Sequence, residues 1–391
     1  MSAALVLSGG GARAAYQVGI LRAVAELLPR EIRNPFPIVC GTSAGAINAL
    51  SIAGHPGAFR ERVASLVRVW RRLRAQDVYR TDFFGVARNS TGLAISLMRG
   101  GCPVDRPLAL LNNTPLRDLL ERHVNFGHID AAIANGELAA VCVTALHYGS
   151  GRSVSFFQGR QPGWERNRRC GQRARLGIDH LMASTAIPLL FPAMRVDDGF
   201  YGDGALRQLK PLSPALHLGA RRLFVVGVSD NPRHRAAALA AQRRPPSVGH
   251  ILGQLLNSAF IDAIESDLET MTAINALAAE IPTSPRPLPG IAHLAPIQAL
   301  CISPSEPIDR IAEQHYRELP RSVRLFLRAI GATTRSSGAS AASYLLFEPG
   351  FCRKLLDLGY RDARDSRERI RAFFRLAEPA NEPDAIRAGK P

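Results

Sequence analysis

The sequence predicts an α/β protein built around a mainly parallel sheet. Short apolar runs typical of buried strands alternate along the chain with segments of helical periodicity, as expected where helices connect parallel strands. Near the N-terminus, glycine-rich turns stand directly between strand and helix. With 391 residues, 46% hydrophobic and 21% charged, the chain can enclose a large core in one or two domains. The predicted strands are Leu5–Ser8, Pro37–Gly41, Leu138–Ala145, Val154–Gln158, Leu223–Val228 and Ile297–Ser303.

The first turn, Gly9-Gly10-Gly11-Ala12-Arg13, lies between the first strand and a helical segment. Consecutive glycines there expose backbone N–H groups that bind an anion, which could be a cofactor pyrophosphate or the oxyanion of an acyl-transfer intermediate. A dinucleotide site requires an acidic residue at the end of the next strand, but that strand ends in Cys40-Gly41-Thr42-Ser43. The oxyanion interpretation is therefore favoured.

The second turn, Gly41-Thr42-Ser43-Ala44-Gly45, follows an apolar strand and leads directly into the helical segment Ala44–Ala53. This is the G-x-S-x-G nucleophile elbow in its strand–turn–helix setting, where Gly41 and Gly45 allow the backbone to pass. The helix N-terminus beside Ser43 favours negative charge. We predict that Ser43 is a catalytic nucleophile; the alternative is a small-residue turn packed between strand and helix.

A third motif is Gly202-Asp203-Gly204-Ala205. An isolated Asp-Gly pair is usually a turn. This one follows Ala183–Pro192, a stretch rich in small residues and proline, so Asp203 is a candidate catalytic carboxylate.

Taken together, these motifs resemble the patatin-like phospholipase family. That family carries a glycine-rich loop with an arginine, a G-x-S-x-G serine and an Asp-Gly-Ala or Asp-Gly-Gly aspartate, which occur here in the same order. The segments Ala183–Pro192 and Asn113–Leu120 also look like family landmarks, and the resemblance extends from about residue 3 to about residue 305. One departure is Ala14, where the family usually has glycine.

The resemblance implies a three-layer α/β/α fold and a Ser–Asp dyad. Ser43 would be the nucleophile and Asp203 the general base, while the amides of Gly10, Gly11 and Ala12 face the oxyanion and Arg13 holds the loop. An aspartate can act as the base only if its site raises its pKa from the ordinary value near ~4. The implied substrate is a phospholipid or another lipid ester, and no cofactor or metal is expected.

Three alternatives remain open. A Ser-His-Asp triad would use a late histidine, His293 or His315, although in that fold the elbow follows several strands rather than one strand–helix unit. The chain could instead be an esterase or thioesterase for soluble acyl compounds. It could also be a non-catalytic scaffold that retained the fold.

The net charge of +16 calls for an explanation. The densest basic stretch is Gly159–Arg175, where arginines surround Trp164; this combination suits contact with an anionic membrane surface. The alternative is a general preference for arginine on solvated faces, since lysine occurs only at Lys210, Lys354 and Lys390. No motif favours nucleic-acid binding.

For domain organisation we expect a catalytic domain at residues 1–305, a helical extension at 306–376 and a disordered tail at 377–391. Further helices are expected at 58–74 and 251–279, an exposed loop or hinge at 233–246, and either a lid or a packed connector at 76–113. We find no secretory signal, no apolar run long enough for a membrane-spanning helix and no C-x-x-C motif or His/Cys cluster. These features favour a cytoplasmic protein that could also contact a membrane peripherally.

Overall fold

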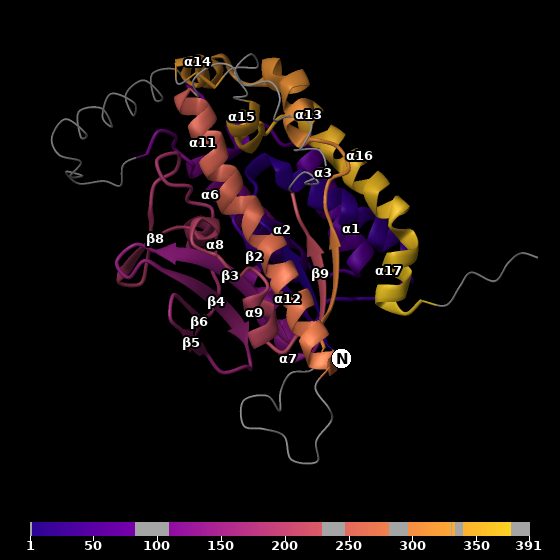
Figure 1. The fold of residues 1–391 in the computed structure, drawn as a ribbon. Coiled ribbons are helices and arrows are strands. Elements are labelled where there is room, and N and C mark those ends of the chain that lie inside the picture. The colour runs from indigo at the N-terminus through magenta and orange to yellow at the C-terminus, as the bar shows by residue number, and fades with distance from the viewer. Residues whose placement is uncertain are drawn as a thin grey trace, which may run out of the picture.

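The computed structural model describes residues 2–82, 109–228, 247–280, 296–329, 331–332 and 339–376. A twisted sheet runs through the molecule and helices cover both of its faces (Figure 1). Most of the predicted lid or connector (83–108), the predicted loop at 233–246, His293 and the tail at 377–391 lie outside the described residues.

One half of the ten-stranded sheet is parallel, in the order β10-β9-β1-β2-β3. Each of these strands was predicted, and each lies within a few residues of its expected position. The shift from the predicted bounds is small because the apolar runs coincide with positions buried on both faces. The bounds are Ala3–Leu7 for β1, Ile38–Thr42 for β2, Ala140–His147 for β3, Arg222–Val226 for β9 and Gln298–Ile302 for β10.

The other half contains antiparallel pairs. The predicted strand β4 (Arg152–Gly159) pairs antiparallel with β3, and the short strands β6 and β5 extend the sheet beyond it. On its other edge β3 also pairs with β8, which continues into β7. The sequence did not indicate these four short strands, whose bounds are Trp164–Arg166 for β5, Arg169–Arg173 for β6, Met194–Val196 for β7 and Gly199–Asp203 for β8.

Strand β1 shows how the layers form. Leu5 and Leu7 belong to the apolar cluster on one face, while Ala4 and Val6 belong to the cluster on the other, as the two-residue period of a strand requires. The first face packs against α1 (Ala15–Leu27), α2 (Ala44–Ala53), α3 (Phe59–Arg72), α16 (Pro349–Asp365) and α17 (Arg367–Phe374). The second packs against α9 (Ser213–His217) and α12 (Ala263–Glu280). The three-layer α/β/α architecture is therefore confirmed.

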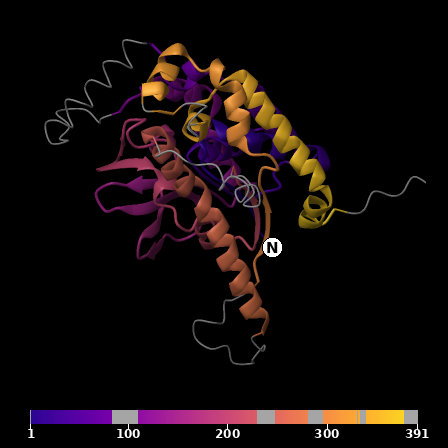
Figure 2. The same ribbon diagram turned by 45° about the horizontal axis from the view of Figure 1, so that its top comes forward.

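The helix predicted at 251–279 is continuous in direction but not uniform. It begins as α11 (Val248–Asn257), passes through a π-helical turn at Ser258–Asp262 and continues as α12. Figure 2 shows this long rod crossing the sheet. A π-turn re-aims the side chains within it and is frequent at functional sites.

The C-terminal helices pack on the N-terminal layer. A Cβ on Gly19 of α1 would lie 2.1 Å from the Leu356 carbonyl oxygen, and one on Gly359 of α16 would lie 2.1 Å from the Tyr16 carbonyl oxygen. The two backbones touch, and one apolar cluster extends from Ala3 to Phe373. A domain boundary near residue 305 remains a prediction. The remaining C-terminal helices are α13 (Ile308–His315), α14 (Arg321–Ala329) and α15 (Ala339–Leu345).

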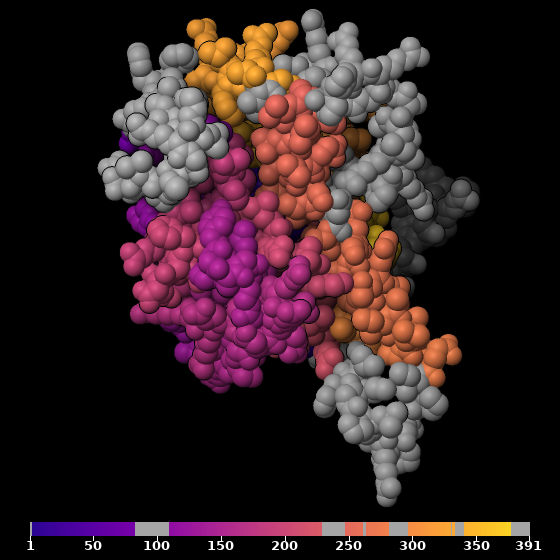
Figure 3. Space-filling model, turned by 60° about the vertical axis from the view of Figure 1, so that its left-hand side comes forward, coloured from indigo at the N-terminus to yellow at the C-terminus, as the bar shows by residue number. Residues whose placement is uncertain are grey.

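Four short helices complete the described structure around the sheet: α4 (Ala75–Val78), α6 (Thr114–His123), α7 (Phe126–Ala134) and α8 (Ile178–Ser184). In Figure 3 the surface over the antiparallel strands and their neighbours is purple and magenta, with α11 and α12 beside it in salmon and orange. Among the described residues, every helix is too short or too polar to cross a bilayer.

Candidate active site

The register of the sheet brings Ser43 and Asp203 together. Strands β2 and β8 lie end to end along one edge of β3, β2 parallel to it and β8 antiparallel. Thr42, the last residue of β2, pairs with Thr144, and Asp203, the last residue of β8, pairs with Ala145. The two strand ends therefore meet, and the Ser43 Oγ donates a hydrogen bond to the Asp203 Oδ2 at 2.5 Å.

Ser43 occupies a strained turn. Its backbone lies at φ 54° and ψ −130°, a region that a side chain rarely adopts and that costs on the order of 1–3 kcal/mol. Neither neighbouring glycine has space for a side chain: a Cβ on Gly41 would lie 2.5 Å from Ala46 Cα, and one on Gly45 would lie 2.3 Å from the Ser8 carbonyl oxygen. This is the geometry expected of a nucleophile elbow.

Two polar side chains that the sequence did not single out brace this turn. The Ser184 hydroxyl accepts a hydrogen bond from the Ser43 N–H at 2.9 Å and donates one to the Thr144 carbonyl at 2.6 Å. On the other side, the Thr42 hydroxyl donates to Gln208 Oε1 at 2.5 Å, and the Gln208 amide donates to Thr144 Oγ1 at 3.2 Å. Ser184 lies in the stretch noted for its composition, but a hydrogen bond over 141 positions leaves no local signal.

Asp203 is completely buried, and burial raises the pKa of its carboxyl group to about 7. The hydrogen bonds from the Ser43 hydroxyl and from the Ala205 N–H, at 3.0 Å, pull the pKa in the opposite direction but do not offset the loss of solvation. Gly204 lets this strand end approach β3, because a Cβ there would lie 2.2 Å from the Thr144 carbonyl oxygen. Asp203 is thus a carboxylate able to accept a proton near neutral pH.

The glycine-rich loop lies directly against the elbow. A Cβ on Gly9 would lie 3.1 Å from the Ser43 Cβ and 2.5 Å from the ring of Phe260, which the π-turn directs toward the loop. Gly11 has φ +54° and would place a Cβ 2.2 Å from the Tyr344 carbonyl oxygen. Gly10 packs on Val228, and a 3₁₀ turn begins at Gly11. The backbone therefore stays close to Ser43.

Ala14, the departure from the family pattern, is fully buried, and its carbonyl accepts a hydrogen bond from the Asn48 amide at 3.1 Å.

Arg13 anchors this loop to the C-terminal helices. Its guanidinium is buried, with Nε donating to the Ser343 hydroxyl at 2.7 Å and Nη2 forming an ion pair with Asp309 at 2.6 Å. The guanidinium also lies 4.3 Å from the centre of the Tyr344 ring. Sequence reasoning assigned Arg13 to the loop but could not identify these partners, which are some 300 positions away.

An apolar cavity starts at Ser43 and Gly11 and runs beside α2 between α3 and α6. It encloses about 880 Å³ including its open mouth. Along α2 its wall includes Ile47 and Ser51, which are one turn apart, and His55 lies just beyond the end of the helix. Most of the remaining wall is leucine, valine and aromatic. Such a shape and lining suit a long apolar ligand placed with one end at Ser43.

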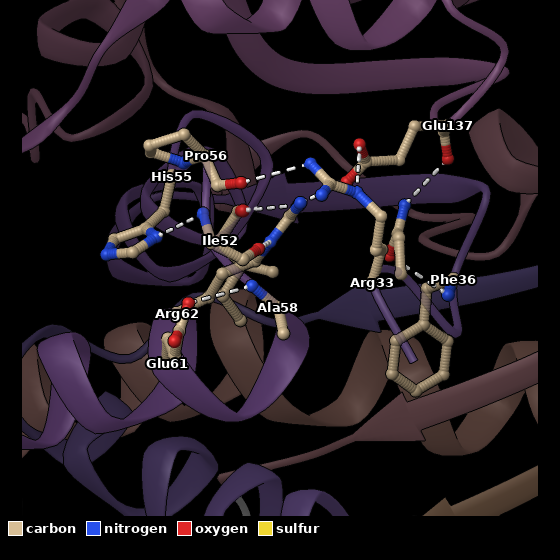
Figure 4. A network of polar contacts seen from close by, with 11 residues as sticks. Arg33, Phe36, Ile52, His55, Pro56, Ala58, Glu61, Arg62 and Glu137 are labelled. Atoms are coloured by element: carbon tan, nitrogen blue, oxygen red, sulfur yellow. Dashed lines mark hydrogen bonds and ion pairs between the residues drawn. The ribbon is translucent and has the colours of Figure 1, made fainter. Parts of the chain in front are cut away.

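Figure 4 shows a polar network around Arg62, one of the residues that line the cavity. The buried guanidinium of Arg62 donates to the Gly57 carbonyl at 2.6 Å and to the Ile52 carbonyl at 3.2 Å, and it pairs with Glu137. Arg33 also contacts Glu137, at 3.3 Å. Burial lowers the pKa of Arg62, and Glu137 counteracts that effect.

The described histidines take no part in the contact between Ser43 and Asp203. His315 pairs with Glu318 at 2.7 Å, on a helix outside the cavity lining, and His293 lies outside the described residues. His55 and His123 line the cavity, and burial lowers the pKa of both. Within the described ranges, no cluster of His, Cys, Asp and Glu is placed to hold a metal ion.

The basic stretch 159–175 forms the outer strands β5 and β6. Trp164 is partly buried there, with its ring stacked 5.1 Å from Phe157 and 4.9 Å from His217. Its indole is therefore part of the packing of this sheet edge.

Comparisons with known proteins place this chain in a family. The sequence profile described as "Patatin-like phospholipase" matches residues 5–216, which include the glycine loop, Ser43 and Asp203. A "cGAMP-activated phospholipase" of Pseudomonas aeruginosa is 28% identical over 205 residues, so the match spans about half of each chain (52% of both).

Among solved structures, human GIVD cytosolic phospholipase A2 is 13% identical with a TM-score of 0.44, covering 96% of this chain and 60% of that one. VipD from Legionella pneumophila is also 13% identical, with a TM-score of 0.30 over 97% of this chain and 88% of that one. With the profile match over more than half of its length, this chain belongs to the patatin-like phospholipase family.

Proposed function

We propose that this chain is a serine lipid acyl hydrolase of the phospholipase A type, cleaving fatty-acyl esters of phospholipids or other lipids through a Ser43–Asp203 dyad. The observation that carries the proposal is the 2.5 Å hydrogen bond from the Ser43 hydroxyl to a buried carboxylate at the mouth of an apolar cavity. Family membership and the phospholipase relative support the choice of a lipid ester as substrate.

In the proposed reaction, Asp203 takes the proton of Ser43 as the serine oxygen attacks the ester carbonyl. Negative charge develops on the carbonyl oxygen, and the amides of Gly10, Gly11 and Ala12 donate hydrogen bonds to it, supported by the N-terminus of α2. Asp203 then protonates the leaving alcohol. Water, deprotonated by the same carboxylate, releases the fatty acid from Ser43.

The size of the cavity supports a long acyl chain. Ser43 precedes α2 and His55 follows it, and the ten residues of this helix span about 15 Å. An extended hydrocarbon of roughly a dozen carbons covers that distance. Arg62, whose guanidinium is held by two backbone carbonyls, also lines the cavity, and the proposed substrate places a medium or long chain in the cavity and its head group outside.

Hydrolysis of phospholipid vesicles, with a soluble short-chain ester in parallel, tests this proposal. The wild type should release fatty acid from vesicles, and Ser43→Ala should lose at least about 10⁴-fold of that rate. Activity confined to the soluble ester would favour an esterase, and activity on neither substrate would favour a scaffold. Full activity of Asp203→Asn alongside an inactive Ser43→Ala would exclude the dyad.

Peripheral contact with an anionic membrane is part of the same proposal. Adding an anionic lipid to the vesicles should increase hydrolysis at low salt, and the increase should disappear as the salt concentration rises, because surface charges are screened. An increase unaffected by salt would contradict an electrostatic contact.

A further inference from the structure

A second hollow lies away from the catalytic cavity, beneath the segment that follows Asp203. Its floor is Ser153 and Ser155 of β4, its side is Trp164 of β5, and it encloses about 400 Å³ including its open mouth. It belongs to the antiparallel half of the sheet shown in purple and magenta in Figure 3. We call it the basic pocket because its charged lining residues are Arg168, Arg169, Arg207 and Lys210.

The positive charges of the basic pocket are poorly compensated. Among the described residues that line it there is no carboxylate. Arg169 Nε donates to the Ser213 hydroxyl and Arg207 Nε to the Gly151 carbonyl, each at 3.1 Å, and both acceptors are neutral. Lys210 has Asp267 at 3.4 Å. Several cations around one concavity repel one another, and a bound anion would remove that cost.

The imidazole of His217 lies near two arginines of this stretch, Arg166 and Arg169. The pKa of His217 is lowered, first by burial and then by the positive charges of Arg166 and Arg169, although a hydrogen bond to the Ser213 backbone raises it. The Trp164 ring is already stacked with Phe157 and His217. The pocket therefore offers guanidinium groups and hydroxyls for an anion rather than a free ring for a nucleobase.

We propose that the basic pocket is a binding site for a phosphate group, held by the guanidinium groups of Arg168, Arg169 and Arg207 and the ammonium group of Lys210. Guanidinium forks match the oxygens of phosphate, and lysine adds a point charge. The phosphate can belong to a lipid head group or to a soluble phosphate compound. This site is separate from the dyad and does not depend on the proposed function.

The basic pocket is in direct contact with the catalytic framework. Gln208 lines the pocket between Arg207 and Lys210, and its side chain holds both Thr42, beside the nucleophile, and Thr144. A phosphate bound by Arg207 and Lys210 would fix the segment that leads directly from Asp203.

The test is titration calorimetry of pyrophosphate into the Ser43→Ala chain, where no turnover can disturb the measurement. Arg168→Gln/Arg207→Gln in this background should weaken binding at least about tenfold, since two charge-assisted contacts are lost. The matched control is Arg160→Gln/Arg173→Gln, which removes the same charge from exposed residues of the same stretch outside the pocket. It should change the dissociation constant less than about twofold.

If pyrophosphate does not bind to the Ser43→Ala chain, the proposal is overturned. It is also overturned if both double variants weaken binding equally, because that result indicates only an effect of net charge. Arg207→Lys, which keeps the charge, should bind better than Arg207→Gln and guards against a folding defect. Competition with phosphatidylcholine vesicles, with and without phosphatidic acid, identifies the source. Displacement of pyrophosphate by phosphatidic acid indicates a lipid head group, and lack of displacement indicates a soluble phosphate compound.

Discussion

Near each of the two ends of α2, beside the apolar cavity, an ionisable side chain is buried, and the surroundings of these two side chains differ in charge. At one end, the described polar contacts of the Asp203 carboxylate are with the neutral Ser43 hydroxyl and Ala205 amide, and its pKa rises to about 7. At the other end, Arg62 is held by two carbonyl oxygens and by the carboxylate of Glu137.

This difference in surroundings fits a structural role for Arg62 and the proposed role of Asp203 as a general base. A buried ion that only supports the fold is stable when its charge is matched, as at Arg62. A general base must be able to gain and lose a proton near the working pH, and an opposite charge beside Asp203 would prevent this by holding its pKa low. The chain therefore leaves Asp203, the proposed catalytic carboxylate, without a counter-charge among its described hydrogen-bond partners, at a cost in stability.

The largest expected effect comes from Asp203→Asn, which removes the base but keeps the shape of the side chain. Hydrolysis should fall by about 10²- to 10⁴-fold, the usual contribution of a general base. Steady-state hydrolysis of vesicles measures this, and retention of more than a tenth of the rate would show that Asp203 is not the base.

The same variant should be more stable than the wild type at alkaline pH. The folded-state pKa of Asp203, about 7, lies above its ordinary value of 3.8, so the contribution of this group to stability is fully present below pH 4 and is lost as the pH rises through 7. An asparagine does not titrate, and the gain above pH 7 should approach about 4 kcal/mol. Urea unfolding of both proteins at pH 4 and pH 8 measures this gain. If the variant and the wild type differ in unfolding free energy by the same amount at both pH values, the raised pKa is contradicted.

At the other end of α2, Glu137→Gln should destabilise the fold by about 3 kcal/mol, because Arg62 keeps a buried and unmatched charge. Glu306→Gln is the matched control, since its partner Arg361 and Glu306 itself are half exposed. That exposed pair should contribute less than about 1 kcal/mol. Urea unfolding of both variants decides the point; similar losses in the two would mean that burial of Arg62 does not matter.

The pH dependence of kcat/KM should follow the Asp203 carboxylate. The rate should rise about tenfold per pH unit up to pH 7 and level off above it, because only the ionised form accepts the serine proton. In Ser43→Ala no such profile should remain. A midpoint near pH 4 would indicate a solvated carboxylate and would weaken the contrast with Arg62.

The smallest expected effect concerns the middle of the apolar cavity, along α2. Ser51→Trp, two turns of α2 beyond Ser43, should block the cavity halfway and reduce kcat/KM for long-chain esters about tenfold or more. Short-chain esters should be hydrolysed as before. Comparison of esters of graded chain length measures this, and equal loss for short and long chains would show that the acyl chain does not enter here.

Much of the fold could be predicted because the parallel strands are apolar on both faces. Each of them therefore appears in the sequence as a nearly continuous run of apolar residues. The strands β5 to β8 could not, because they are short and carry charges or glycines instead of an alternating pattern. β8 matters most among them. The sequence motif drew attention to Asp203, but the pairing of Asp203 with Ala145, which brings it to Ser43, is a property of the sheet register.

For the site, local motifs pointed to Ser43, the glycine loop and Asp203 as candidates, since each requires tight turns that only small residues permit. The residues that brace them left no local signal. Ser184, Gln208 and the partners of Arg13 act through hydrogen bonds between segments more than a hundred positions apart. Such contacts depend on the completed fold, and one sequence alone does not reveal them.

The anchoring of Arg13 gives the glycine loop a support of very high contact order, because the Ser343 hydroxyl that accepts its hydrogen bond is 330 positions away. Contacts between such distant segments form late in folding, since a long stretch of chain must be ordered before they can be made. We therefore expect the glycine loop to reach its final geometry only after the parallel sheet and the C-terminal helices have come together.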